Sequence, residues 1–428
     1  MPEQILWKFI ANEDTLSMDA YVARGGYESA RKVVTSMTPE QVVQEVKQSN
    51  LRGLGGAGFG TGMKWSFIPK NLNKPVYLAV NADEGEPGTF KDRYIMERSP
   101  HLLIEGIIIC CYTVGSHRAY IYVRGEYDQS IARLEKAIAG AKEKGFLGEQ
   151  VFGKPFKLEI IVHRGAGAYI CGEETALLES LEGKKGFPRL KPPFPAVSGL
   201  WGCPTVINNV ETLAYLPTII SKGGAWFASL GCEKNGGLRL FGVSGHVKKP
   251  GIYELPLGIT LRSIIYDYAG GIRDGHRLKC VVPGGLSAAV LTADEIDIKM
   301  DFDSLKAKGT MLGSAGVMVM DETVCMVRAL YITMRFFAHE SCGQCSPCRE
   351  GTGWMEKVVS RVLNGNGSVQ DLKTIAETAK YLSGTTICAL AEGAAMPLAS
   401  YVEKFYSEFE GHVRHKTCEL KPQELVHA

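Results

Sequence analysis

Four cysteines constrain the fold of this chain more than any other feature of its sequence. Three of them, Cys342, Cys345 and Cys348, are spaced three residues apart, and Cys388 follows one short segment later. A cube of four irons and four sulfides needs four thiolates that converge on one point, and a C-x₂-C-x₂-C loop supplies three of them. The fold must therefore return Cys388 to this loop. A chain built in this way handles single electrons.

Other uses of these cysteines have to be weighed. Structural zinc sites usually consist of two C-x₂₋₄-C pairs separated by a loop, whereas three closely spaced thiols favour an iron–sulfur cluster. Unligated thiols are a further alternative. A disulfide framework is disfavoured because the chain is long and its start shows no secretory leader. Of the 12 cysteines in the sequence, we interpret the other eight, including Cys110 and Cys111, as small buried hydrophobic residues.

Composition excludes several classes of function. The chain has 428 residues, of which 45% are hydrophobic and 22% charged, and this favours a globular protein of about three domains. A net charge of +2 gives no electrostatic basis for binding nucleic acid. The most apolar stretch, Leu102–Gly115, is shorter than the ~20 residues that a membrane span requires, so we expect a core helix or strand. The N-terminus resembles neither a leader nor a transit sequence, which indicates a cytoplasmic protein without membrane insertion.

A glycine-rich loop near the N-terminus predicts a ligand site. Thr38–Lys47 has a capping threonine, an N1 proline and helical spacing, and it leads into Arg52–Gly62. The loop contains a G-x-G-x-x-G pattern, but it follows a helix and not the strand of a Rossmann fingerprint. Its glycines would let the backbone approach a flat or anionic ligand, with Lys64 just beyond. A loop without function is the alternative.

Two strand-to-loop transitions suggest a pocket at the edge of a parallel sheet. Pro75–Val80 reads as a buried strand, and polar residues follow it at positions 81–86. Ligands of α/β proteins bind beyond the carboxyl ends of strands, although acidic turns also occur for local reasons. Phe156–Val162 predicts a second strand, followed by a loop at Arg164–Tyr169 and a helix at Gly172–Ser180. Two glutamates in its first turn would be favoured by the helix dipole even without a ligand.

Two further segments belong to the predicted N-terminal α/β domain. Phe187–Pro195 is rich in proline, and we expect a stiff, extended stretch that holds Phe194 over a cleft. Thr205–Thr212 reads as the capped start of a helix, where free backbone N–H groups could meet a phosphate.

Beyond Gly237 the pattern changes to short alternating runs, which predict a small mixed sheet with one helix. From Glu322 to Val413 helical periodicity dominates, and a four-helix bundle would return Cys388 to the cysteine loop. The predicted domains are 1–236, 237–308 and 309–428, a Rossmann-like α/β domain, a small module and an all-α bundle.

Four long motifs occur in one order along the chain: Gly55–Phe59 with Thr61–Phe67, Asn81–Arg93, Gly165–Leu177 and Ser341–Gly351. Together they resemble the flavin-binding, NADH-oxidising subunit of respiratory complex I, in its bacterial form, over almost the whole chain. The resemblance implies an α/β domain for FMN and NADH, a β-grasp (ubiquitin-like) module and a four-helix bundle with a [4Fe–4S] cluster.

The resemblance also assigns residues. The FMN pocket would be formed by Gly55, Gly56, Gly58, Lys64, Asn81, Asp83, Glu84, Tyr169, Gly172, Glu173, Glu174, Ile207, Asn208, Asn209 and Thr212. NADH would be bound by Phe59, Lys64, Phe67, Glu86, Glu174 and Phe194. The cluster ligands would be Cys342, Cys345, Cys348 and Cys388. The family commonly has arginine at the position of Leu54 and proline at that of Gly60, and the sequence around Cys388 is a looser match, so these positions depart from its pattern.

The function implied is oxidation of NADH by hydride transfer to FMN, with electrons passed singly to the cluster. We name no catalytic side chain because the cofactors carry the chemistry, while Glu84 and Glu174 would position nicotinamide and flavin. Implied partners are a thioredoxin-like [2Fe–2S] subunit and the large multi-cluster iron–sulfur subunit, in the peripheral arm on the cytoplasmic face of the bacterial inner membrane.

Two alternatives remain open at this point: a diaphorase subunit of an NAD-linked hydrogenase or formate dehydrogenase, and a zinc-stabilised structural subunit. We also hypothesise that Glu174 and Glu86 select NADH over NADPH by repelling a 2′-phosphate.

Overall fold

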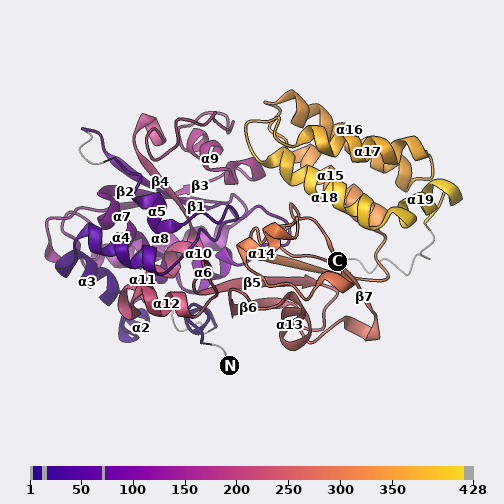
Figure 1. Cartoon of the computed structure of the whole chain (residues 1–428). Helices are drawn as coiled ribbons and strands as arrows, with labels where there is room; N and C mark the ends of the chain where they lie inside the picture. Colours follow the sequence, from indigo (N-terminus) through magenta and orange to yellow (C-terminus); the bar gives the residue numbers. More distant parts are fainter. Residues whose placement is uncertain (1–2, 12–16, 70–72, 419–428) are drawn as a thin grey trace. The chain divides into compact units, whose positions relative to one another are not determined.

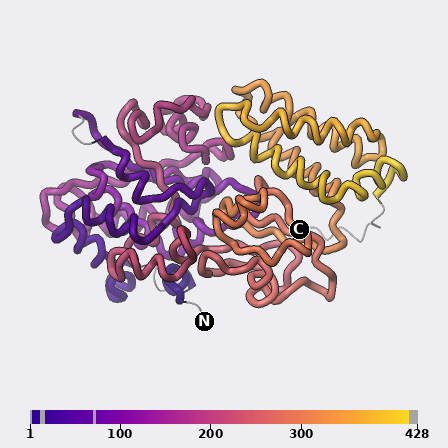
Figure 2. Tube along the Cα trace, viewed as in Figure 1, coloured from indigo at the N-terminus to yellow at the C-terminus, as the bar shows by residue number. Residues whose placement is uncertain are grey.

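The computed structural model describes residues 3–11, 17–69 and 73–418. The chain divides into two compact units, each of which is discontinuous in sequence. The first comprises residues 1–85, 89–241 and 252–259, and the second comprises 86–88, 242–251 and 260–428. Figures 1 and 2 show the course of the chain from the N-terminal α/β part to the C-terminal helices.

The first unit is built on a four-stranded parallel sheet with the order β3-β2-β1-β4. Its strands are β1 (Val76–Ala82), β2 (Ser116–Val123), β3 (Glu159–Arg164) and β4 (Thr205–Asn209). Its helices are α1 (Trp7–Ile10), α2 (Met18–Ala23), α3 (Glu28–Ser36), α4 (Pro39–Gln48), α5 (Thr61–Trp65), α6 (Asp92–Arg98), α7 (Pro100–Val114), α8 (Asp128–Glu143), α9 (Glu174–Leu181), α10 (Val210–Ala214), α11 (Leu216–Lys222) and α12 (Gly224–Ser229). Helices follow strands in succession, so the parallel sheet is connected by helical crossovers.

Local sequence signals explain several boundaries. Helix α4 has Thr38 as its N-cap, a capping box with Gln41 and a proline in its first turn, as the sequence predicts. The apolar stretch forms α7, which begins at Pro100 and ends before Gly115 in the left-handed conformation. Almost all of α7 is buried, so it is a core helix of the first unit. Among the described residues, no helix combines the length and the apolar character needed to cross a membrane.

Three sequence predictions in this unit need correction. The segment from Thr205 is first a strand, β4, and the helix begins only at Val210, because a β-branched run pairs with β1. The strand predicted at Phe156–Val162 is β3, and it starts at Glu159, three residues later than expected. Helix α9 starts at Glu174, and Glu173 is its N-cap and not part of its first turn.

The second unit begins with a mixed sheet in which the strand order is β6-β5-β9-β7-β8. The strands are β5 (Leu238–Gly245), β6 (Gly251–Pro256), β7 (Leu278–Val282), β8 (Leu291–Thr292) and β9 (Gly316–Asp321), and the boundary between the units falls within β5 and β6. A short helix α13 (Leu261–Ser263) continues into a π-helical turn, and α14 (Phe302–Ala307) precedes β9. The sheet is therefore mixed, as the alternating runs after Gly237 predict.

The C-terminal part consists of helices, namely α15 (Met326–Glu340), α16 (Ser346–Leu363), α17 (Val369–Leu382), α18 (Leu390–Lys404) and the shorter α19 (Tyr406–His415). Helix α15 packs against α16 and α18, and α17 packs against the same two helices. The four long helices thus enclose one core, and α19 contacts each of them. Figure 1 shows them in orange and yellow.

Candidate functional site

Polar residues gather at the carboxyl ends of β1 and β4. The two strands pair in register, with Asn81 opposite Asn209, so their final residues lie side by side. The side-chain amide of Asn81 donates to the carbonyl oxygen of Gly172 at 2.8 Å. This bond joins the end of β1 to the segment before α9. The edge predicted from the strand pattern is therefore where the structure brings three separate segments together.

The glycine loop closes on the same edge. A Cβ atom placed on Gly55 would lie 3.0 Å from the Cβ of Asn209, so the loop backbone approaches this side chain closely. The backbone N–H of Leu54 donates to the hydroxyl of Thr212 at 2.8 Å. Gly56 has a φ of +136°, which side chains rarely adopt. Glycine is thus required at position 55 for the close approach to Asn209 and at position 56 for the backbone conformation.

Lys64 links α5 to the end of β4 and to α9. Its Nζ donates to the carbonyl oxygen of Ile207 at 2.8 Å and lies 3.4 Å from Glu174 Oε2. Lys191 contacts the same glutamate at 2.8 Å and Glu173 at 3.0 Å. Burial opposes ionisation of Glu174, but the two lysines outweigh it and hold its pKa below the ordinary value. Two carboxylates and two ammonium groups therefore form one ionised network.

Glu84, predicted as a pocket residue, bonds the backbone at the start of α6. It is buried, and it accepts hydrogen bonds from the backbone N–H groups of Lys91 (2.8 Å), Asp92 (2.8 Å) and Arg93 (3.2 Å). Burial first, and the charge of Asp92 second, raise its pKa to about 7, against the opposing effect of Lys91. Glu84 consequently ties the loop after β1 to the start of α6. Next to it, the backbone N–H of Asp83 donates to Asn81.

Other predicted residues lie on the same segments. Tyr169 begins the 3₁₀ turn that ends at Gly172, directly before the Glu173 cap. Asn208 is buried in β4, and its Oδ1 accepts from the indole N–H of Trp65 at 2.9 Å. Asn209 caps α10 and also donates to Asp92 at 2.6 Å. These contacts fix the orientation of the amides beneath the glycine loop.

The three phenylalanines predicted to contact NADH are exposed and belong to the first unit. Phe59 and Phe67 are 49% and 52% exposed, and their ring centroids are 6.0 Å apart. Phe194 is 58% exposed. Large exposed aromatic rings next to a polar pocket are suited to stacking against a planar ligand.

Glu86 stands apart from this set because it belongs to the second unit. There its Oε1 accepts from the backbone N–H and the hydroxyl of Ser287, at 2.8 and 2.7 Å.

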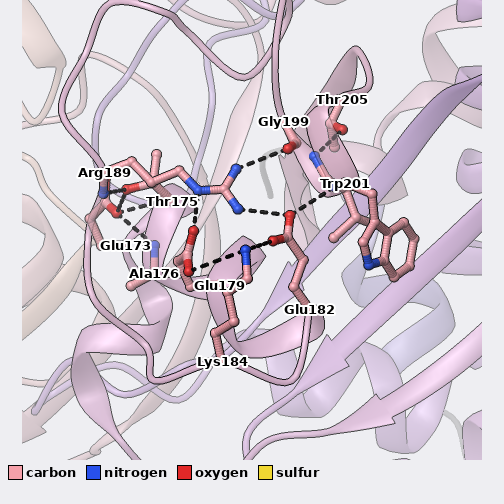
Figure 3. Close-up of polar contacts among 11 residues, drawn as sticks. Glu173, Thr175, Ala176, Glu179, Glu182, Lys184, Arg189, Gly199, Trp201 and Thr205 are labelled. Atoms are coloured by element: carbon pink, nitrogen blue, oxygen red, sulfur yellow. Dashed lines mark hydrogen bonds and ion pairs between the residues drawn. The ribbon is translucent and has the colours of Figure 1, made fainter. Parts of the chain in front are cut away.

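The proline-rich segment is held by a network that sequence reasoning missed (Figure 3). Arg189 donates to Glu179 at 2.5 Å, to Glu182 at 2.7 Å and to the carbonyl oxygen of Gly199 at 2.9 Å. Its own backbone N–H donates to Thr175 in α9 at 2.8 Å. This clamp fixes the segment that carries Lys191 and Phe194. The only sequence signal for it was a pair of basic residues among prolines.

The expectation of a stiff, extended segment is wrong in part. The chain bends at residues 191–193. Polyproline II geometry does not describe such a bend.

The cysteine loop connects α15 to α16 and meets the turn between α17 and α18. Cys342 and Cys345 lie between the two helices, and Cys348 lies in the first turn of α16. The backbone N–H of Ile387, the neighbour of Cys388, donates to Cys345 Sγ at 3.4 Å. Burial raises the pKa of Cys348, Ser341 opposes this through a hydrogen bond, and Cys342 and Cys345 add to it. The fold therefore returns Cys388 to the loop, as the first expectation required.

The prediction for the remaining cysteines holds for half of them. Cys110, Cys111, Cys171 and Cys280 are buried, whereas Cys203, Cys232, Cys325 and Cys418 are partly exposed. In the sequence, Cys325 lies in an apolar run, Val324–Val327, like several buried cysteines, whereas Cys232 and Cys418 have charged neighbours.

Comparison with known proteins agrees with this geometry. Family models match residues 46–218 (Nuo51 FMN-binding domain), 240–288 (SLBB domain) and 328–412 (NADH-ubiquinone oxidoreductase-F iron-sulfur binding region). An NADH-quinone oxidoreductase F subunit of Rhizobium meliloti (strain 1021), numbered 2 in its name, is 53% identical, over 98% of this chain and 99% of that protein. The chain belongs to the family of NADH-quinone oxidoreductase F subunits. It thus combines the family's FMN-binding and iron–sulfur binding regions, and the recognition based on four motifs is confirmed.

Further relatives in this family show the same extent of similarity. The NADH-quinone oxidoreductase F subunit of Mycobacterium bovis (strain ATCC BAA-935 / AF2122/97) is 52% identical, over 94% of this chain and 91% of that protein. Among solved structures, the crystal structure of an NAD⁺-reducing [NiFe]-hydrogenase in the H₂-reduced state matches with a TM-score of 0.83 and 34% identity. The match covers 96% of this chain and 67% of the hydrogenase chain.

Proposed function

We propose that this protein oxidises NADH at a bound FMN and delivers the electrons one at a time to a [4Fe–4S] cluster, as the electron-input subunit of respiratory NADH:quinone oxidoreductase. The observation that supports this most strongly is that one chain joins a glycine-lined pocket at a parallel-sheet edge to four cysteines gathered by a helical fold. Membership of the F-subunit family over nearly the full length agrees with it.

The residues at the sheet edge fit a flavin nucleotide. The glycine loop offers backbone without side chains, and Gly55 approaches Asn209 so closely that a Cβ would be in tight contact. Asn81, Asn209 and Thr212 supply amide and hydroxyl groups for a polar ring system and a ribityl phosphate, and Lys64 supplies a positive charge. FMN bound here would accept a hydride and release electrons singly.

The chain's own residues would bind and orient the two nucleotides. In our proposal Phe59, Phe67 and Phe194 stack on the adenine of NADH, each stacked pair contributing about 0.5–1.5 kcal/mol beyond burial. Glu174 is held ionised by Lys64 and Lys191, so it accepts hydrogen bonds from the polar parts of NADH. Glu84, whose carboxylate bonds the backbone at the start of α6, would position the flavin and the nicotinamide through this segment.

The cysteine loop fits a cubane cluster by the chemistry of its donors. Three thiols come from the loop, and the fourth, Cys388, follows Ile387, whose backbone N–H points at Cys345 Sγ. N–H groups directed at cluster sulfurs are one of the means by which proteins set cluster potentials. A cluster held by Cys342, Cys345, Cys348 and Cys388 would supply one-electron transfer.

We further propose that the chain comprises three functional domains, 1–236, 237–308 and 309–428, the middle one a β-grasp module whose sheet is completed by β9 (Gly316–Asp321) from beyond the second boundary. The partners would be a thioredoxin-like [2Fe–2S] subunit and the large multi-cluster subunit, on the cytoplasmic face of the bacterial inner membrane. Two large exposed aromatic side chains, Trp354 on α16 and Tyr381 on α17, lie on the helices that border the cluster cysteines. Exposed aromatic residues are enriched where protein interfaces form, which supports electron exit to another protein.

The decisive experiment is anaerobic purification followed by measurement of flavin and iron per chain and titration with NADH. We expect about one FMN and about four irons. NADH should bleach the flavin absorption and produce the EPR signal of a reduced cubane. A chain that retains neither flavin nor iron under these conditions would refute the proposal.

A second candidate is the diaphorase subunit of an NAD-linked hydrogenase, which the fold match favours. Purification from the native cells distinguishes the two. Association with a rotenone- or piericidin-sensitive quinone reductase supports the first proposal, whereas H₂-dependent reduction of NAD⁺ by the isolated complex supports the second.

A further inference from the structure

Three metal-binding side chains converge at the opposite end of α15 from the cluster loop. Cys325, His412 and Cys418 each offer one ligand atom, and these three atoms all lie within 4.8 Å of one another. Cys325 precedes α15, while the cluster loop begins after Glu340 at its other end. At 1.5 Å per residue this helix of 15 residues separates the two groups by about 22 Å. The three residues therefore form a group distinct from the cluster ligands.

The arrangement of His412 is that of a metal ligand. Its Nε2 lies 3.5 Å from Cys325 Sγ. Its Nδ1 lies 2.9 Å from the carbonyl oxygen of Glu408, to which it donates when the ring is neutral. This bond leaves the Nε2 lone pair directed at the thiol. Metal-bound histidines are usually oriented by such a hydrogen bond from their second nitrogen. His412 is also only 1% exposed, so its position is fixed by packing.

Distances agree with tetrahedral coordination. Zn–S and Zn–N bonds of ~2.3 and ~2.05 Å at a tetrahedral angle place sulfur and nitrogen about 3.6 Å apart. The observed separation of 3.5 Å between Cys325 and His412 corresponds to this value. A simple S–H···N hydrogen bond would also explain that pair, but it would not explain why Cys418, beyond the end of α19, reaches the same point.

Backbone contacts fix the position of the Cys325 sulfur. This residue is the N-cap of α15, and its sulfur accepts from the backbone N–H of Arg328 at 3.4 Å. The nearby carboxylate of Glu408 is already engaged by the N–H of Met326 at 2.8 Å and by Lys279 at 2.7 Å. The site thus has two sulfur donors and one nitrogen donor, and a water molecule would take the fourth position.

We propose that Cys325, His412 and Cys418 bind one Zn²⁺ ion in a structural site separate from the [4Fe–4S] cluster. Two thiolates and one imidazole form a soft donor set that suits zinc, and hard cations such as Mg²⁺ avoid it. The ion would join the chain after α19 to the start of α15, two segments that are remote in sequence. It would thereby hold the short helix α19 on the four longer ones. This inference does not depend on the proposed NADH chemistry.

Zinc and iron analysis of the full chain, purified anaerobically from zinc-containing medium, tests the proposal. We expect about one zinc per chain in the wild type, none in Cys418→Ser and an unchanged content in the control Cys203→Ser. Cys345→Ser should lose iron and keep zinc, which separates this site from zinc misloaded at the cluster. Wild-type protein without zinc, zinc retained by Cys418→Ser, or zinc lost only in Cys345→Ser would overturn the proposal.

A second pair of variants distinguishes the loss of a metal ligand from the loss of the fold. His412→Gln should lose zinc, whereas His412→Cys should retain it because a third thiolate replaces the imidazole. Cobalt-grown wild-type protein should show the thiolate charge-transfer absorption of a tetrahedral site, and this absorption should be absent from His412→Gln. A Cys325–Cys418 disulfide in the wild type, found by mass spectrometry under non-reducing conditions, would show that the thiols serve another purpose.

Discussion

At the scale of single residues, neighbouring lysines change the effect expected of the Glu174 carboxylate. The hypothesis that Glu174 repels the 2′-phosphate of NADPH takes only the charge of this carboxylate into account. Without screening, two like charges ~4 Å apart repel each other by about 4 kcal/mol at a dielectric constant of ~20. The structure adds Lys64 and Lys191, which contact this carboxylate at 3.4 and 2.8 Å. These cations offset much of the repulsion. Selection against NADPH should consequently be weaker than the single charge suggests.

We therefore expect Glu174→Gln to reduce the ratio of kcat/KM for NADH to that for NADPH by about tenfold, which corresponds to ~1.4 kcal/mol. The variant removes negative charge while both lysines remain to attract the 2′-phosphate. Steady-state kinetics with both nucleotides measure the ratio, and Glu143→Gln on the exposed side of α8 is the control. An unchanged ratio in Glu174→Gln, Glu86→Gln and the double variant would contradict the selection hypothesis.

Glu84 gives a prediction about pH. Its pKa in the folded protein is about 7, above the value of about 4.5 expected in the unfolded chain. Between these values the folded state binds more protons, so the contribution of Glu84 to stability falls as pH rises, by up to about 1.4 kcal/mol per pH unit. Thermal unfolding between pH 5 and 8 should show a smaller decline in Glu84→Gln than in the wild type. Identical pH slopes would mean that Glu84 is ionised throughout.

At the scale of elements, sequence predicted helices with clear end signals better than elements defined by pairing. Helix α4 has its cap, capping box and proline within four residues, so local chemistry sets its start. Strand β4 has no such signal, and its run Thr205–Asn209 becomes a strand because β1 offers a parallel partner. Helix α9 begins later than expected because the Glu173 side chain accepts from the N–H groups of Thr175 and Ala176 and caps the helix.

The contact between α7 and α10 gives a prediction at this scale. A Cβ on Gly106 would lie 2.1 Å from the carbonyl oxygen of Leu213, whose backbone cannot move without shifting α10. Gly106→Ala should therefore destabilise the protein, by roughly 1–3 kcal/mol, as overpacked core variants do. Chemical denaturation measures the change.

Gly140→Ala in α8 is the matched control, since its nearest atom, Met18 Cε, would be 3.8 Å away. This variant should stabilise by about 0.5–1 kcal/mol, through the better helix propensity of alanine. Equal effects of the two substitutions would show that α7 and α10 do not pack as closely as the structure indicates.

At the scale of the whole molecule, the two proposed cofactor sites belong to different compact units. The glycine loop and sheet edge lie in the first unit, and the four cluster cysteines lie in the second. Each unit has its own core, so a substitution at one site should affect the binding of one cofactor only.

Cys388→Ser should accordingly lose most of its iron while retaining FMN, and NADH should still bleach the flavin. Gly55→Val should lose most of its FMN while retaining iron. Its added side-chain atoms would meet Asn209 and fill the space within the glycine loop. Flavin and iron analysis of both variants checks this. Loss of both cofactors in both variants would contradict independent units.

The sequence by itself determined the elements whose signals are local. The cysteine spacing, the capped helix α4, the apolar helix α7 and the four motifs were readable because each depends on neighbouring residues. They were sufficient for the family, the parallel sheet and the need for Cys388 to return to the loop.

Only the tertiary structure decided which distant groups meet. Arg189 contacts Glu179 across 10 positions, Lys191 contacts Glu174 across 17, and His412 lies beside Cys325 across 87. Charge neutralisation and metal coordination depend on distances in space, which packing sets and which leave no periodic trace in sequence. For this reason the ligands of the cluster were predicted from spacing, and the proposed zinc site was not.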